Sequence, residues 1–380
     1  MLAAAVLAGT ALALTACGSG SAAPAAAAGT PSAAAGTASC RSQVSALVTQ
    51  HLAARRQDWF PATSPSGSLV KGKHYWVVDL TTAIPSIADF AYGFKAAAEA
   101  VGAKVTVFDG QGTPTGAAQG VNDAVAAHAD GIVTVLIDPR SIASAVGNAE
   151  AAGIPIIEGD TGAPFPPFQA GVAAAAAQNQ VLMGGWEADS ALQLTNCNLH
   201  AVVLTDPGNI AASSVFNGIQ AEVKRYCPVG CSTVTVGMQA KDIATEATGD
   251  VENALRLHSD TNAIIEVADP YEPFVATALT ALDSKVPVIT ASAMGNLAGT
   301  GGPSDSVAAD IVFPPALSHG WYYMQAILDL ASGQKNVSVE FPIGLIDRSN
   351  GLTTDPSSYS GTSPFAGFQA KFGNLWGVSG

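Results

Sequence analysis

The chain has 380 residues, too many for one ordinary hydrophobic core, so its length predicts two lobes with flanking segments. Its formal net charge of −14 and the lack of a basic stripe exclude the usual nucleic-acid-binding surface, where clustered Lys and Arg meet the phosphates. Apolar residues make up 48% of the chain and aromatics only 7%, which is typical of helices packed closely on a sheet and excludes a fibrous or disordered chain.

The first sixteen residues form an apolar run that is too short to span a bilayer but long enough for a signal peptide. The run ends in LTAC, Leu14 to Cys17, and Gly-Ser-Gly follows. This pattern resembles the bacterial lipobox, which implies cleavage before Cys17 and a diacylglyceryl group on its sulfur. We therefore expect a signal peptide over 1–16 and lipidation of Cys17, although no Lys or Arg precedes the run. A buried helix with a chance Cys is the alternative.

Four further cysteines remain: Cys40, Cys197, Cys227 and Cys231. An even number in an oxidising compartment predicts two disulfides, and the sequence allows three pairings. Cys227 and Cys231 could instead be half of a zinc site, but no second Cys or His pair with metal spacing accompanies them. We expect neither a metal nor another cofactor.

The segment after Cys17 is rich in Ala, Ser, Gly, Pro and Thr, and it predicts a flexible tether over 17–39. Residues 40–72 are interpreted as an N-terminal extension, with helical spacing from Cys40 to Trp59 and then a linker. No later stretch of the sequence is long and apolar enough to span a membrane.

From Tyr75 onward, short apolar runs alternate with amphipathic segments, which predicts parallel strands covered by helices on both faces. In the first half, strands are predicted at 75–80, 104–108, 131–137, 154–157 and 170–175, and helices at 86–101, from 113 and from 138. Ser86 and Thr113 are the expected N-caps of the first two helices, and Gly153 is the expected C-cap of the third.

The same alternation repeats in the second half, opened by a helix predicted at 181–194. Strands are predicted at 201–204, 233–236, 263–267, 286–290 and 307–313, and helices at 211–226, 242–258, 271–282 and 317–331. No short repeat indicates a solenoid. The sequence therefore predicts two similar α/β lobes in tandem.

Several short motifs occur in a fixed order along both halves. They are Pro85, Gly93, DGI at 130–132, DP at 138–139, GIPII at 153–157 leading to Asp160, NGI at 217–219, DTNAI at 260–264, AD at 268–269 and VPVI at 286–289. This order resembles the type I periplasmic binding proteins of the sugar-binding class over about 75–339. The resemblance implies two Rossmann-like, doubly wound lobes joined by a three-strand hinge.

With that fold, residues 73–177 and 314–340 would form lobe 1, residues 178–313 and about 341–355 lobe 2, and residues 356–380 a C-terminal tail. The resemblance also implies that the ligand lies between the lobes. Open parallel sheets independently favour this place, because they bind ligands at the carboxyl ends of their strands.

When the family's sugar-binding positions are carried over to this sequence residue by residue, most of them hold a residue without the family's polar group. Only the Asp at 160 is retained. Ile84 replaces the family's usual Asn, Ser86 and Ile87 replace its aromatic pair, and Val215 replaces its Arg. Farther along the chain, Ala268 replaces the second-lobe Asn, Ser292 replaces the Asp, and Phe313 replaces the late Gln. Loop residues Gln111, Asp138, Asp269 and Tyr271 complete the predicted ligand-binding set.

Each candidate also has an ordinary structural interpretation. Asp138 and Asp269 each precede a Pro and could be helix N-caps, and Asp160 fits a cap as well as a ligand role. Trp186 and Phe313 are more typical of a core than of a stacking platform.

Two hypotheses for the ligand stay open. A buried hydroxyl without a partner costs roughly 1–3 kcal/mol, so several missing polar groups would abolish tight binding of a typical pentose or hexose. The ligand would then be less polyhydroxylated or partly apolar. Alternatively, Asp269, Tyr271, Trp186 and Gln111 rebuild a sugar site in another geometry.

The resemblance implies a monomeric, extracytoplasmic solute-binding lipoprotein with three partners: a small-molecule ligand, the permease of an ABC importer, and the membrane through its lipid. One alternative is a receptor that presents its ligand to a membrane sensor kinase. An enzyme acting through Asp160 or Asp269 is the other. We do not expect an enzyme, because the six His are scattered and neither a Gly-x-Ser-x-Gly elbow nor a phosphate-binding Gly-Lys-Ser loop is present.

Overall fold

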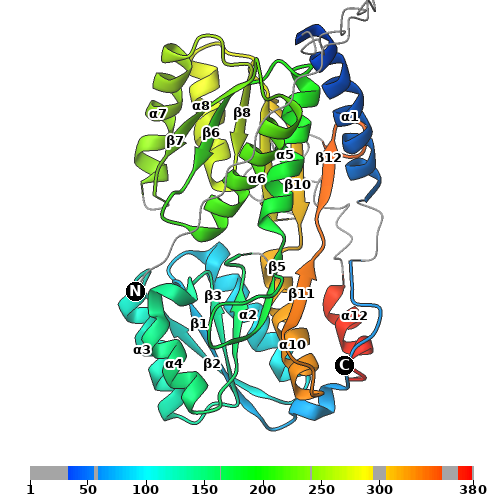
Figure 1. Cartoon of the computed structure of the whole chain (residues 1–380). Helices are drawn as coiled ribbons and strands as arrows, with labels where there is room; N and C mark the ends of the chain where they lie inside the picture. Colours follow the sequence, from blue (N-terminus) through cyan, green and yellow to red (C-terminus); the bar gives the residue numbers. More distant parts are fainter. Residues whose placement is uncertain are drawn as a thin grey trace, which may run out of the picture.

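The computed structural model describes residues 33–54, 59–162, 164–239, 242–293, 305–352 and 367–378. They form two α/β lobes, one above the other in Figure 1, each built on a six-stranded sheet. The signal peptide, Cys17 and most of the predicted tether lie outside the described residues. Within those residues, no helix combines the length and the apolar character needed to cross a bilayer.

Lobe 1 is a wholly parallel sheet in the order β11-β5-β4-β3-β1-β2. Its strands are β1 His74–Asp79, β2 Lys104–Asp109, β3 Gly131–Val135, β4 Ile156–Gly159, β5 Val172–Gln178 and β11 Val337–Phe341. Its helices are α2 Pro85–Ala100, α3 Pro114–Ala126, α4 Ala143–Ala151 and α10 Ala316–Ala331, with a 3-10 turn η2 at Pro139–Ile142.

Lobe 2 repeats this arrangement in the order β12-β10-β9-β8-β6-β7, with only β12 antiparallel. Its strands are β6 His200–Thr205, β7 Ser232–Gly237, β8 Ala263–Glu266, β9 Val288–Ala293, β10 Val307–Phe313 and β12 Gly344–Asp347. Its helices are α5 Gln180–Leu194, α6 Ile210–Tyr226, α7 Ile243–Leu257 and α8 Glu272–Ala281, with a 3-10 turn η3 at Asp269–Tyr271.

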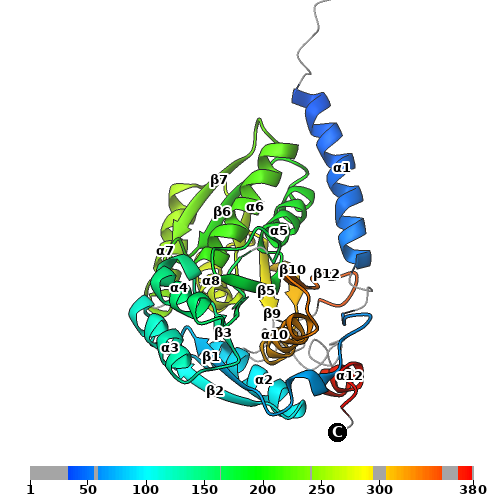
Figure 2. The ribbon, with the colours of Figure 1, turned by 60° about the horizontal axis from the view of Figure 1, so that its bottom comes forward.

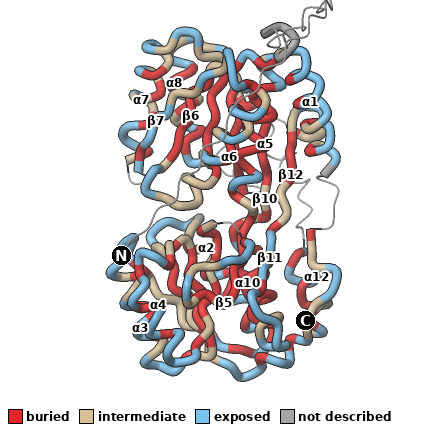
Figure 3. The backbone as a smooth tube through the Cα atoms, viewed as in Figure 1, coloured by how far each residue is buried: buried red, intermediate tan, exposed pale blue. Residues whose placement is uncertain are grey.

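Helices cover both faces of each sheet, so alternate residues of one strand enter different cores. In β1, Tyr75 and Val77 belong to the core that contains Phe94 of α2, whereas Val78 belongs to the core formed with α3 and α4. Both faces are buried along central strands such as β3, β8 and β9 (Figure 3), which explains the continuous apolar runs of the sequence.

Three crossings join the lobes: Asn179 between β5 and α5, Pro314–Pro315 between β10 and α10, and Pro342–Ile343 between β11 and β12. β5 and β10 are each parallel to the strand beside them, and each runs at its carboxyl end into the other lobe. The carboxyl ends of the two sheets therefore face each other across the crossings (Figure 1). The two-lobed, doubly wound fold predicted from the sequence is confirmed.

The N-terminal extension, here called the strap (residues 33–54 and 59–72), spans both lobes on one side of the crossings. Its helix α1, Ala33–Ala54, packs on α5 of lobe 2 and is joined to it by the disulfide Cys40–Cys197 (Figures 1 and 2). Farther along, the Tyr322 hydroxyl of lobe 1 donates a hydrogen bond to the Trp59 carbonyl. The strap thus adds a further connection between the lobes.

A short C-terminal helix, α12 at Phe368–Leu375, covers the lobe 1 end of the strap. The Gly67 N–H donates to the Trp376 carbonyl oxygen at 2.9 Å. Trp376 is fully buried and stacks on Trp321 with ring centroids 5.1 Å apart. The end of the predicted C-terminal tail is therefore part of the lobe 1 core.

Some local expectations are confirmed and others are wrong. Thr113 caps α3 through its side chain, and Gly153 follows α4 with a positive φ of 71°. Ser86 is not the cap of α2, because that helix begins at Pro85, whose fixed φ suits the first helical position. The tether was predicted to run to residue 39, but α1 begins at Ala33, in a run of Ala that favours helix.

The disulfide pairing is Cys40–Cys197 and Cys227–Cys231. The prediction that these four cysteines form two disulfides is confirmed, and the alternative of half a zinc site is wrong.

Candidate functional site

The candidate site is the pair of facing carboxyl edges, where several strands end in polar side chains. On lobe 1 these residues are Asp79, Asp109, Asp138, Asp160 and Gln178; on lobe 2 they are Thr205, Glu266, Asp269 and Ser292. They come from strand ends and the loops after them, far apart in the sequence, and the parallel order of the strands brings each set to one edge.

Three of the eight described non-glycine residues with a positive φ lie at the lobe 1 edge. Gln111, Leu136 and Asp160 have positive φ values of 56°, 56° and 58°, and each lies one or two residues beyond the end of a strand. Non-glycine residues rarely adopt this conformation, and such strain clusters at functional sites. The strain therefore marks the ends of β2, β3 and β4 as candidate ligand loops.

Asp160 is 1% exposed, and its carboxylate is held within lobe 1. The Tyr323 hydroxyl donates to Asp160 Oδ2, and His319 Nδ1 lies 3.0 Å from the same oxygen. The loop after Asp160 leads to β5 and not into a helix, so the cap alternative for Asp160 is wrong. Its predicted ligand role remains a prediction: Oδ2 is engaged by these contacts, whereas the buried Oδ1 has no hydrogen-bond partner among the described residues.

Asp138 has the cap role that was its alternative. It accepts a hydrogen bond from the Arg140 N–H at 2.9 Å and forms an ion pair with the Arg140 guanidinium at 2.8 Å. Hydrogen bonding and the charge of Arg140 outweigh partial burial and lower the pKa of Asp138. Asp269, in contrast, is the first residue of η3 and not its cap, because Ala268 occupies the cap position.

Exposure divides the remaining candidates. Ile84 and Gln111 are exposed at the edge and Ile87 is half-buried, while the Ser86 side chain lies outside the described residues. Val215 is buried where α6 crosses α5.

Two further candidates are fully or almost fully buried. Ser292 donates to Asp310 Oδ2 at 2.6 Å, and Tyr271 is 2% exposed. Phe313 lies 5.9 Å from the ring of His319, so the structure brings Phe313 and Asp160 together around that histidine. Trp186 stacks on His51 of the strap and belongs to the lobe 2 core.

His319 and Tyr323 were not predicted as site residues. Both lie on α10, 159 and 163 positions after their partner Asp160, so no local pattern connects them. The only available signal was the type of residue: a histidine and a tyrosine in the first two turns of a predicted helix that begins at a hinge crossing.

Burial changes the acid–base properties of several carboxyls near the edges. Asp79 is 0% exposed, and desolvation by burial, together with the charge of Asp109, raises its pKa to about 8, although the N–H groups of Leu80 and Thr81 act to lower it. In lobe 2, burial likewise raises the pKa of Glu187 and Glu266 well above the usual range. Asp79 is therefore held largely protonated near neutral pH, and burial favours the protonated form of Glu187 and Glu266.

Nothing in the described ranges provides a metal site, since no three His, Cys, Asp or Glu side chains there are placed to hold an ion. Glu187, Glu266 and Asp310 are each buried but do not converge on one point.

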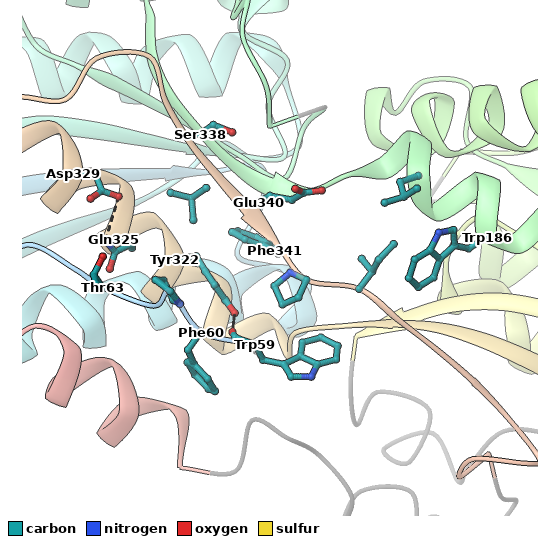
Figure 4. A pocket seen from close by; sticks show the side chains of 15 residues that line it. Trp59, Phe60, Thr63, Trp186, Tyr322, Gln325, Asp329, Ser338, Glu340 and Phe341 are labelled. Atoms are coloured by element: carbon teal, nitrogen blue, oxygen red, sulfur yellow. Dashed lines mark hydrogen bonds between the residues drawn. The ribbon is translucent and has the colours of Figure 1, made fainter. Parts of the chain in front are cut away.

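A cavity of about 560 Å³ lies on the strap side of the crossings (Figure 4). Trp59 and Phe60 of the strap, Trp186 of α5 and Tyr322 of α10 contribute to its wall, together with the β11–β12 crossing. Because these segments belong to different lobes, the shape of the cavity depends on the angle between the lobes.

The family model described as "Periplasmic binding protein domain" matches residues 78–335 of this chain. No curated protein sequence matches this chain.

Many solved structures share the fold. A solute-binding protein of an ABC transporter from Mycobacterium smegmatis, with bound glycerol, is 21% identical, with a TM-score of 0.64, covering 77% of this chain and 98% of that one. One from Burkholderia graminis in complex with D-arabinose is 21% identical, with a TM-score of 0.63 and coverages of 74% and 97%. A 5-methylthioribose transporter solute-binding protein from Thermotoga lettingae is 14% identical, with a TM-score of 0.64 and coverages of 81% and 94%.

Proposed function

We propose, from the premise that the chain belongs to the periplasmic binding protein domain family, that it is an extracytoplasmic lipoprotein that captures a small molecule and delivers it to an ABC importer. The family consists of solute-binding proteins and not enzymes, so capture and release need no catalytic group. The observation that carries the proposal is the facing pair of carboxyl edges, joined by three short crossings.

Rotation about these crossings would close the lobes over a ligand. The crossings are one or two residues long at Asn179, Pro314–Pro315 and Pro342–Ile343, so rotation can be absorbed there without unfolding either sheet. Ligand contacts that exist only in the closed state shift the equilibrium toward closure. The permease would recognise the closed arrangement.

We propose a ligand related to sugars but less polyhydroxylated. Ile84 is exposed at the lobe 1 edge, Phe313 is partly buried beside His319, and Asp160 Oδ2 is already occupied by His319 and Tyr323. This combination offers fewer polar partners than a typical sugar requires. The similar protein from Thermotoga lettingae binds 5-methylthioribose, a sugar that carries an apolar substituent.

A thermal-shift panel of sugars, polyols, nucleosides and small apolar metabolites tests the proposal. A ligand at one hundred times its Kd adds about 2.7 kcal/mol of stability, which raises Tm by several degrees in a protein of this size. Small-angle scattering with the best ligand should then show compaction. If no compound raises Tm, or if the best one leaves the scattering curve unchanged, the capture mechanism is wrong. If pentoses and hexoses give the largest increases in Tm, the proposal of a less polyhydroxylated ligand is wrong.

Lipid attachment is a separate part of the proposal and rests on Cys17 in its lipobox-like context. In a bacterial host, metabolic labelling with an alkyne fatty acid should mark the wild-type chain and not Cys17→Ser. Cys40→Ser is the matched control, because that cysteine is in a disulfide. Neighbouring genes for a permease and an ATPase favour import, whereas a sensor kinase gene favours the receptor alternative.

A further inference from the structure

We propose that His319 is a positioning residue that couples the Asp160 loop to the hinge. The proposal rests on the proposed function, since it describes how occupation of the cleft and rotation of the lobes are connected. It concerns one side chain on α10, in the first turn after the Pro314–Pro315 crossing.

Both ring nitrogens of His319 are engaged, and the side chain is 0% exposed. Nε2 lies 2.8 Å from the carbonyl oxygen of Pro314, which belongs to the crossing. Nδ1 lies 3.0 Å from Oδ2 of Asp160, the strained residue that follows β4. One imidazole therefore connects a hinge crossing with a candidate ligand loop.

The partners of His319 determine how many hydrogens the pair carries. A carbonyl oxygen only accepts, so Nε2 must carry a hydrogen. Asp160 Oδ2 already accepts from Tyr323, and a bare Nδ1 facing an ionised carboxylate would place two acceptors 3.0 Å apart. The contact therefore needs one hydrogen, either on Nδ1 or on the carboxyl. In both cases the His319–Asp160 pair has no net charge.

The ring of His319 also contacts the residues that precede two of the three crossings. Its centroid lies 4.7 Å from that of Phe341, the last residue of β11, and 5.9 Å from that of Phe313, the last residue of β10. The ring of Phe90 of α2 also packs against His319, with ring centroids 4.9 Å apart. Phe341 belongs to lobe 1, like His319, whereas Phe313 belongs to lobe 2. Rotation at the Pro314–Pro315 crossing must therefore shift Phe313 or the Pro314 carbonyl relative to His319, and this links the lobe angle to the orientation of Asp160.

Removing the imidazole should therefore change the distribution of lobe angles even without ligand. His319→Phe keeps a ring of similar shape but loses both hydrogen bonds. His319→Gln keeps one amide donor. The matched control is His258→Phe, because His258 follows α7 in lobe 2 and touches no crossing.

The test is a distance distribution between spin labels on the ligand-free full chain. Labels at Ser144→Cys on α4 and Thr280→Cys on α8 report the separation of the lobes, and Cys17→Ser removes the remaining reactive thiol. We expect His319→Phe to broaden the distance distribution. The population at the wild-type separation should fall about tenfold relative to the populations at other separations. His319→Gln should lie between it and the wild type, and His258→Phe should match the wild type.

Two results would overturn the proposal. One is an unchanged distribution in a folded His319→Phe or, if that variant does not fold, in His319→Gln. The other is an NMR spectrum in which Nδ1 of His319 is bare beside an ionised Asp160 carboxylate. Both measurements are made without ligand, so their failure is distinguishable from failure of the thermal-shift panel, which concerns the proposed function.

Discussion

Asp79 and Asp109 are register partners at the ends of the neighbouring strands β1 and β2, yet their pKa values shift in opposite directions. Burial raises the pKa of Asp79 to about 8. The Gln111 N–H, which donates to Asp109 Oδ1 at 2.9 Å, lowers the pKa of Asp109. The same residue type at the same level of the sheet is thus held protonated on one strand and ionised on the next.

Asp79→Asn should flatten the pH dependence of stability. Between its unfolded pKa near 4 and its folded pKa of about 8, Asp79 binds a proton only in the folded state, so stability falls as the pH rises through this window. The substitution should remove about 1.4 kcal/mol of that fall per pH unit. Urea unfolding at pH 5, 6, 7 and 8 measures it, and parallel curves for variant and wild type would contradict the prediction.

Asp109→Asn is the matched control with the opposite sign. The stability that Asp109 contributes is present above its unfolded pKa and is lost as the pH falls through its lowered folded pKa. The variant should therefore be less stable than the wild type at pH 7, and this loss should shrink toward pH 3. A gain of stability at pH 7 would show that its hydrogen bonds are not stabilising.

Gly320→Ala should destabilise lobe 1 strongly. A Cβ at Gly320 would lie 1.9 Å from the Phe94 backbone nitrogen, because α10 and α2 cross at this point. Backbone must then move, at a cost of roughly 3 kcal/mol or more. Gly147→Ala is the control, because this position in α4 has nothing within 4 Å and should gain about 0.5–1 kcal/mol. Thermal unfolding of both variants measures the two effects. Equal Tm values for the two variants would contradict the explanation that α10 and α2 cross too closely for a Cβ at Gly320.

The two disulfides should differ in their contribution to stability. Cys40–Cys197 closes a separation of 157 residues, whereas Cys227–Cys231 closes one of 4. From chain entropy alone, the double Ser variant should lose about 5 kcal/mol in the first case and about 2 kcal/mol in the second. Urea unfolding under oxidising conditions tests this, and the expectation is wrong if the short-loop variant loses more.

Ile84→Asn should improve binding of sugars. Ile84 is 43% exposed next to the start of α2, where the family resemblance implies an Asn that holds a hydroxyl. One added hydrogen bond corresponds to about a fivefold to tenfold lower Kd for the sugar with the largest thermal shift. Calorimetric titration measures it. Leu257→Asn, at a 79% exposed position on α7, controls for added surface polarity, and an equal gain there would argue against Ile84 as a ligand position.

Local sequence patterns were enough to predict most elements of the fold. β10 coincides with its predicted range, and α3 begins after the predicted cap Thr113. Gly93 and Gly218 belonged to the motifs behind the family resemblance, and each allows two helices of one lobe to cross at backbone distance. These features depend on neighbours a few residues apart, which the sequence shows directly.

The site depended much more on distant partners. Asp138 could be predicted as a cap because Pro139 follows it directly, and the structure agrees. For Asp160 the sequence offered two roles, and its contacts with His319 and Tyr323 could not be foreseen from residues about 160 positions away. The resemblance proposed Ile84 and Val215 equally, although Ile84 is exposed and Val215 is buried at the crossing of α5 and α6.

Two α/β lobes could be predicted from the sequence, because the period of apolar residues follows from local backbone geometry. The cysteine pairing, the protonation of Asp79 and the contacts of the strap with both lobes became visible in the folded structure alone, because burial and contact energies depend on which distant segments meet. Asp79 and Asp109 are the same residue type, and they acquire opposite properties only when the sheet is assembled and Asp79 becomes fully buried.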